Sequence, residues 1–313
     1  CGAAPWARFT GGSADSNGQI TQVGADERTF RGEISADFYG LQLGGDFACF
    51  NGHFNGWDLA GGGIAGFNDG RSTQPVFALN TTGELSDTIT SVTDVEFFQS
   101  YAGIYGTAVK DRFVAEMQYR VEQTEFMANN EGRNGSFGLG LTDSEFDSNS
   151  STVSGSLSYA YSIPDTELLL VPVAGFAYTQ ISTDPIIFDD GSIVEVSDFD
   201  SRIGFVGGTL SRTKFGEDGT TALNQFVTAT YYNDFADNPE SQYTSGDGLD
   251  TRIVSTENLG NYTELSAGVN YVKILDVGNS VNAKQLSASA RADIRISDQL
   301  ESWGVTAQVR LQF

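Results

Sequence analysis

The sequence predicts an all-β fold, specifically a transmembrane antiparallel β-barrel of about twelve strands. Three observations predict it. Segments of alternating apolar and polar residues recur along the whole chain, no run of about 18 apolar residues could form a membrane helix, and short connections alternate with long ones. The composition agrees, because 37 Gly, 22 Phe and 12 Tyr against 6 Pro is typical of strands.

The alternation has one apolar and one polar face in every clear segment. In FVAEMQYRVEQT the odd positions from Phe113 to Val121 are apolar, whereas the even positions from Glu116 to Thr124 are polar. The closing segment GVTAQVRLQF repeats the pattern, with apolar residues at odd positions from Val305 to Phe313. A period of two indicates strands, and we expect the apolar face to contact lipid and the polar face to line a lumen.

Strand boundaries follow from these segments to within two to four residues each. The predicted strands are 4–13, 35–48, 56–68, 93–108, 112–126, 151–161, 167–182, 199–213, 221–233, 262–274, 281–296 and 302–313. Together they form a single domain over residues 1–313.

The connections between these strands are sorted by length. Those after the even-numbered strands are short, whereas most of the others are long and acidic, such as 127–150 and 234–261. This asymmetry is typical of bacterial outer-membrane barrels, with short turns in the periplasm and long loops outside. An even number of strands then puts both termini in the periplasm. A soluble sandwich is the less favoured alternative, because it has no reason to sort its loops by length.

Charge excludes one class of partner. The chain has 17 Lys and Arg against 41 Asp and Glu, a net charge of -24, whereas nucleic-acid binding needs a basic surface. One explanation of the acidic loops is that they keep the cell-surface end of the protein soluble. The alternative is that they bind divalent cations, in a site of irregular geometry because no segment has EF-hand spacing. No signal peptide is visible, so an exported protein would have its targeting segment removed or upstream of residue 1.

Several segments carry a resemblance to a known family. They are PWARFTGG at 5–12, ADFYGLQLGGDF at 36–47, SYAGIYGTAVKDRFVAEMQYRV at 100–121, ELSAGVNY at 264–271 and GVTAQVRLQF at 304–313. In this order and spacing the chain resembles the autotransporter β-domain, the translocator of type V secretion, from about residue 5 to residue 313. The strongest piece is YGLQLGGD, from Tyr39 to Asp46.

The resemblance implies a twelve-stranded barrel that anchors and exports an upstream passenger, with a helical segment in the lumen. The alternative is a stand-alone outer-membrane barrel without passenger, acting as a narrow pore or as a structural envelope or docking protein. Expected partners are outer-membrane lipid and lipopolysaccharide, the barrel assembly machinery, and a passenger segment or envelope protein. In this family, inward-pointing aromatic residues often cover glycines of a neighbouring strand. The resemblance therefore suggests that Phe38 lies beside Gly11 or Gly12.

Charged and amide residues on the polar faces of the predicted strands are expected to line the lumen. Opposite charges there would form a network that either holds a helix or sets the electric field of a small pore. The candidates are Asp46, Glu116, Gln118, Arg120, Glu122, Glu264, Arg291, Asp293, Arg295, Gln308 and Arg310.

No catalytic, metal or cofactor site is expected. The single histidine, His53, falls in the short predicted turn 49–55, where no nucleophile of the opposite rim could use it. Luminal carboxylates are better explained as partners of luminal arginines than as catalytic acids. We therefore predict a protein that is not an enzyme.

Two further features concern the chain ends. Cys1 and Cys49 would lie side by side if the first two strands form a hairpin, so an oxidising periplasm would permit a disulfide. A lipidated Cys1 is the weaker alternative. At the other end, bacterial barrels resemble one another in finishing on alternate apolar residues and a terminal Phe, which the assembly machinery reads by strand pairing. The residues of this assembly signal are Val309, Leu311 and Phe313.

Overall fold

The computed structural model describes residues 2–23, 28–79, 85–130, 140–275 and 284–312. Twelve long strands follow one another along these ranges. They are β1 (Gly2–Val23), β2 (Arg28–Phe54), β3 (Trp57–Leu79), β4 (Leu85–Lys110), β5 (Phe113–Asn129), β6 (Ser144–Tyr159), β8 (Leu168–Thr183), β11 (Phe199–Phe215), β12 (Thr221–Asp234), β15 (Asn261–Ile274), β16 (Gln285–Ile296) and β17 (Leu300–Gln312). Five short strands lie in the connections: β7 (Tyr161–Ser162), β9 (Ile186–Ile187), β10 (Ile193–Val196), β13 (Glu240–Thr244) and β14 (Thr251–Thr256).

The sheet closes on itself through its first and last strands. Each long strand pairs antiparallel with the next, and β1 pairs with both β2 and β17. At one level of this seam, Trp6 lies directly between Gly44 of β2 and Arg310 of β17. Closure leaves no strand edge along the barrel wall, which confirms the predicted twelve-stranded antiparallel barrel.

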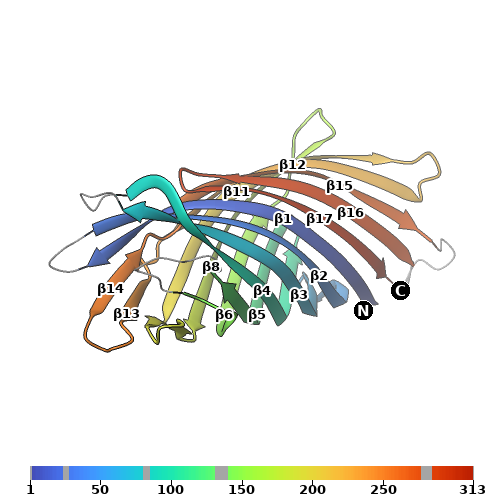
Figure 1. Ribbon diagram of the computed structural model, residues 1–313. Helices are drawn as coiled ribbons and strands as arrows, with labels where there is room; N and C mark the ends of the chain where they lie inside the picture. The colour runs from blue at the N-terminus through green and yellow to red at the C-terminus, as the bar shows by residue number, and fades with distance from the viewer. Residues whose placement is uncertain (1, 24–27, 80–84, 131–139, 276–283, 313) are drawn as a thin grey trace.

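Both chain ends and the short turns lie at one end of the barrel. Figure 1 shows the start of β1 beside the end of β17, on the right of the view. The β2–β3 turn there has only two residues, Asn55 and Gly56, with φ angles of 58° and 85°. Two successive positive φ angles match the twist of a tight hairpin, and Asn followed by Gly is the usual pair for such a turn.

The opposite end is built partly of short strands rather than of irregular loops. β13 and β14 form a hairpin within residues 235–260, and β14 pairs with the end of β1, where Ile20 faces Thr256. β10 then pairs with both β13 and β9. These short strands therefore extend the sheet beyond the barrel wall, at the lower left of Figure 1.

The first four strands are much longer than predicted. β1, β2, β3 and β4 have 22, 27, 23 and 26 residues, whereas a membrane-spanning strand needs only about ten. The added residues come from segments such as 14–23, which the sequence assigned to loops. Residues 14–19 have no large apolar side chain on either face, so they lack the alternation that marks a strand, although their backbone continues the same ladder.

The packing of the wall is inverted relative to a water-soluble protein. Large apolar side chains on its outer face are exposed, including Ile104, Met117 and Leu157, each more than 60% exposed. On the inner face, the carboxylates of Glu122 and Glu264 are buried, at 9% and 5% exposed. Such a wall suits lipid outside and polar contacts inside. No helix long and apolar enough to cross a membrane occurs in the described ranges.

Candidate functional site

The inner face brings together charged side chains from strands that are far apart in the sequence. Alternate residues of each strand point to this face, because successive side chains of a strand point to opposite sides. The eleven residues named from the sequence lie on β2 (Asp46), β5 (Glu116, Gln118, Arg120, Glu122), β15 (Glu264), β16 (Arg291, Asp293, Arg295) and β17 (Gln308, Arg310).

The largest ion-pair cluster is centred on Glu264. Its Oε1 atom accepts a hydrogen bond from Arg291, and its Oε2 atom lies 2.8 Å from Nε of Arg295. Arg291 also approaches Asp293, with Nε 3.6 Å from Oδ1. A carboxylate this deeply buried needs such partners, because an unpaired buried charge is costly. The cluster therefore ties β15 to β16.

A second cluster is centred on Asp46 and crosses the seam of the barrel. Its Oδ2 atom lies 2.8 Å from Nη2 of Arg310 on β17, and its Oδ1 accepts a 3.1 Å hydrogen bond from Nε1 of Trp6 on β1. Nε1 of Trp6 also lies 3.2 Å from the hydroxyl of Tyr105 on β4. Strands that are not neighbours in the wall are thus connected across its concave side.

A third chain of polar contacts runs along β3, β4 and β5. Glu122 accepts a 2.7 Å hydrogen bond from Nε of Arg120 and another of 2.7 Å from Nε2 of Gln99. Gln99 in turn accepts from Nδ2 of Asn68 at 2.6 Å. The guanidinium of Arg120 also lies over the ring of Tyr101, 5.2 Å from its centroid. These contacts hold the Arg120 side chain in one orientation.

A cavity of about 640 Å³ lies on the inner face, nearer to the end that carries the termini. Its polar lining includes Arg8 of β1, Glu116 and Gln118 of β5, and Gln308 of β17. The guanidinium of Arg8 donates from Nε and Nη2 to Oε1 of Gln308, at 2.9 and 2.8 Å. The cavity can therefore receive a polar ligand or a peptide, with both signs of charge available.

On the inner face, aromatic rings of one strand cover glycines of the neighbouring strand. A Cβ added to Gly44 would lie 2.3 Å from the ring of Trp6, and one on Gly62 would lie 2.5 Å from Tyr105. Tyr101, Phe97, Phe205 and Phe226 stand in the same relation to Gly66, Gly70, Gly175 and Gly268. Each ring belongs to the residue directly opposite its glycine in the ladder.

The register places Phe38 directly opposite Gly12 in the ladder of β1 and β2, as suggested, but the closest atoms to that glycine come from the other neighbouring strand. The nearest atoms to a Cβ at Gly12 belong to the backbone of Trp303 and Gly304, at 2.3 to 3.3 Å. At Gly11 the nearest ring is that of Phe9, and Phe38 contributes only its backbone oxygen at 3.5 Å. Close approach of the β17 backbone at the seam therefore leaves no room for a larger residue at Gly12.

Sequence reasoning missed the uncharged members of these clusters. Trp6 and Tyr105 complete the Asp46 cluster, and Gln99 completes the Glu122 chain. Tyr232 and Tyr262 stack with ring centroids 4.7 Å apart, beside Phe205. A usable signal was present, because these residues share the parity of the polar face rather than of the apolar face.

Some sequence predictions fall on parts of the chain that the structure does not describe. Cys1, Phe313 and the side chains of Cys49 and His53 lie outside the described residues, so the Cys1–Cys49 disulfide stays a prediction. Val309 and Leu311 lie on β17, opposite Ala288 and Leu286 of β16. The described residues hold no group of three or more His, Cys, Asp or Glu side chains arranged for a metal ion.

Comparison with known proteins identifies the family. The family model described as the autotransporter β-domain matches residues 5–273, which is well over half of the chain. The chain belongs to the autotransporter β-domain family. It is accordingly an integral outer-membrane barrel of the translocator type. No curated protein sequence matches it.

Solved structures of autotransporter β-domains have the same fold. The transport unit of the autotransporter AIDA-I from Escherichia coli matches with a TM-score of 0.65 and 13% identity, over 99% of this chain and 90% of that one. The β domain of the Bordetella autotransporter BrkA matches with a TM-score of 0.64 and 16% identity, over the full length of both chains. The translocator domain of NalP from Neisseria meningitidis matches with a TM-score of 0.56 and 14% identity, over 99% and 88%.

Proposed function

We propose that this autotransporter β-domain anchors an upstream passenger in the outer membrane and exports it through the lumen of the barrel. The observation that carries the proposal is the polar, concave inner face of a closed barrel, with its cavity of about 640 Å³ and its fixed charges. The family supports it, because its solved relatives are described as transport units and translocator domains.

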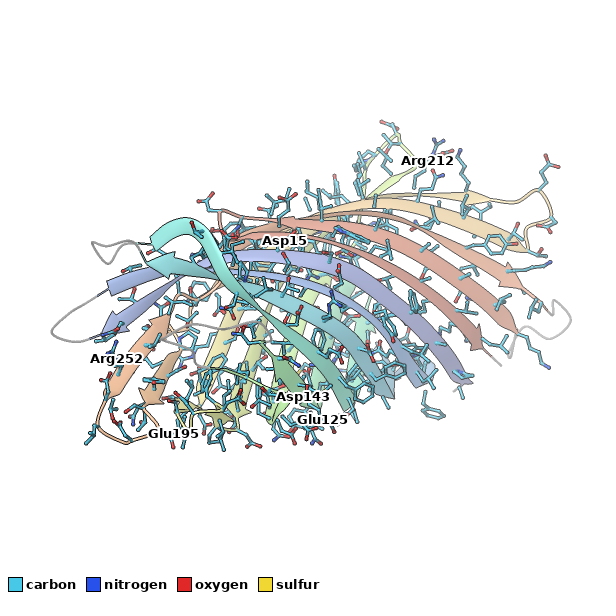
Figure 2. The ribbon with its side chains drawn as sticks, viewed as in Figure 1. Asp15, Glu125, Asp143, Glu195, Arg212 and Arg252 are labelled. Carbon is cyan, nitrogen blue, oxygen red and sulfur yellow. The ribbon has the colours of Figure 1, made fainter. Side chains whose placement is uncertain are left out.

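The same proposal implies which end of the barrel faces the periplasm and which faces the cell exterior. The end with the chain termini and the two-residue turn would face the periplasm, and the end with β9, β10, β13 and β14 would face outward. In Figure 2, Glu125, Asp143, Glu195 and Arg252 lie on the proposed outward side, whereas Arg212 lies at the opposite side of the view. Both termini would then be periplasmic, and a peptide entering from there would reach the surface.

The proposed partners follow from this placement. The exposed apolar wall would contact outer-membrane lipid, and lipopolysaccharide headgroups would surround its outward rim. The apolar face of β17, with Val309 53% exposed, would present the strand that the assembly machinery pairs with during insertion. We propose no enzymatic activity, because the inner carboxylates Asp46, Glu122 and Glu264 are engaged with arginines.

Surface display tests the proposed export. A reporter domain with an epitope would be fused upstream of residue 1, behind a secretion signal, and expressed in a Gram-negative host. We expect the epitope to be labelled by antibody on intact cells and removed by external protease. A barrel that reaches the outer membrane while the reporter stays in the periplasm would contradict export. In that case, single-channel conductance of the purified barrel would test the alternative, a narrow pore.

A further inference from the structure

Two charged residues of the inner cavity differ from all the others. Arg8 and Glu116 both line it, yet neither pairs with an opposite charge among the described residues. By contrast, the four inner-face arginines named from the sequence each have a carboxylate within 4 Å. The pairs are Arg120 with Glu122, Arg291 and Arg295 with Glu264, and Arg310 with Asp46.

The register of the strands explains why Arg8 has no carboxylate. Its neighbours on the inner face are Gln42 of β2 and Gln308 of β17, which are both amides. Gln308 accepts two hydrogen bonds from the guanidinium, which orients the group but does not neutralise it. The ring of Trp6, 5.2 Å away, supports the guanidinium from one side. Arg8 is therefore a fixed positive charge that still has N–H groups free to donate hydrogen bonds to a ligand.

Glu116 is placed in the same way. Its inner-face neighbours are Thr107 of β4 and Ser156 of β6, and both are neutral hydroxyl residues. Ser156 Oγ lies 3.5 Å from Oε2 of Glu116, which is the limit of a hydrogen bond. Glu116 is also exposed, whereas the paired carboxylates of Glu122 and Glu264 are buried. Its charge is thus available to whatever occupies the cavity.

We propose that Arg8 and Glu116 bind the peptide segment that passes through the barrel, with Arg8 receiving a carboxylate and Glu116 a cationic side chain of that segment. The inference rests on the export function proposed above, since it needs a peptide in the lumen. A guanidinium binds a carboxylate through parallel hydrogen bonds. The attraction between opposite charges is also stronger in a cavity than in bulk water. The segment would therefore carry at least one acidic and one basic residue.

A fluorescence titration tests the charge assignment. Trp57→Phe and Trp303→Phe leave Trp6, which contacts Arg8, as the single tryptophan of the folded full-length chain in detergent. The probes are alanine-rich peptides with one Glu and one Lys at several spacings, each compared with the same peptide carrying Gln at both positions. We expect a Glu and Lys peptide to change Trp6 fluorescence, and its Kd to rise at least tenfold in Arg8→Gln or Glu116→Gln.

Controls separate the charge assignment from folding and from export. Arg212→Gln removes an arginine outside the cavity and should leave the Kd unchanged, and each variant is checked for heat-modifiable migration on gels. The inference is overturned if no charged peptide binds, if the Gln peptide binds equally well, or if both variants keep the original Kd. The surface-display assay reads out export separately, so an intact display with unchanged Kd would refute only the charge assignment.

Discussion

Nη2 of Arg310, on the last strand, lies 2.8 Å from Oδ2 of Asp46, on the second strand, so this ion pair spans the first strand between them. Trp6 of the first strand joins the same carboxylate through its indole nitrogen. One side chain thus connects the three strands at which the barrel closes. The seam is held from the inside by polar contacts as well as by its backbone ladder.

Removing this carboxylate should weaken the barrel. Asp46→Ala leaves the Arg310 guanidinium without its partner and breaks the hydrogen bond from Trp6, so we expect the free energy of unfolding to fall by about 1–3 kcal/mol. Urea unfolding in detergent, followed by tryptophan fluorescence, measures the change. Glu167→Ala, which breaks the exposed pair with Arg212, is the matched control and should cost less than about 1 kcal/mol. Equal losses in the two variants would contradict a structural role for the seam pair.

Substitution of two adjacent glycines by alanine tests whether the packing of an aromatic ring on a glycine contributes to stability. Gly44→Ala would put a Cβ 2.3 Å from the ring of Trp6, so we expect a cost of about 1–3 kcal/mol from overpacking. Gly45→Ala is the control, because nothing lies within 4 Å of its Cβ. We expect that variant to change stability by no more than about 0.5 kcal/mol. The urea midpoint compares both variants, and a similar shift in each would rule out ring packing as the cause.

The stability of the turn between β11 and β12 should depend on pH, because the Asp218 carboxylate accepts hydrogen bonds within it. The side-chain hydroxyl of Thr220 donates to Asp218 at 2.6 Å and its backbone N–H at 3.0 Å, and these hydrogen bonds lower the pKa of the carboxyl below its ordinary 3.8. A depressed pKa means that the stabilisation is complete above the unfolded pKa and is lost as pH falls through the lower folded value. Carbon-detected NMR titration measures this pKa. Thr220→Val should raise it, and an unchanged value would show that the hydroxyl contributes nothing.

Deleting Phe313 should impair insertion more than it alters the folded barrel. The terminal apolar residues are proposed to be the strand that the assembly machinery reads, whereas β17 is already paired with β1 or β16 over residues 300–312. The measurement is the amount of barrel in outer-membrane fractions, beside the unfolding midpoint of the purified protein. Unchanged outer-membrane levels after the deletion would refute the assembly signal.

The membrane-spanning strands could be predicted from the sequence because lipid on one face and polar contacts on the other impose strict alternation. Met117 and Tyr119 alternate with Gln118 and Arg120 for this reason. The extension of β1 over residues 14–19 could not be predicted, because neither of its faces has a large apolar side chain. Contacts such as Trp6 with Asp46 depend on the exact register between strands, which alternation alone does not give.

Site-specific crosslinking tests the central claim, passage of a peptide through the lumen, most directly. A photoreactive amino acid would replace either Gln118, on the inner face, or its neighbour Tyr119, which is exposed on the outer face. Cells exporting the upstream reporter would be irradiated and the products analysed on gels. The account predicts a crosslink between barrel and reporter segment from position 118 and none from position 119. A reporter that reaches the surface without ever being captured from position 118 would contradict it.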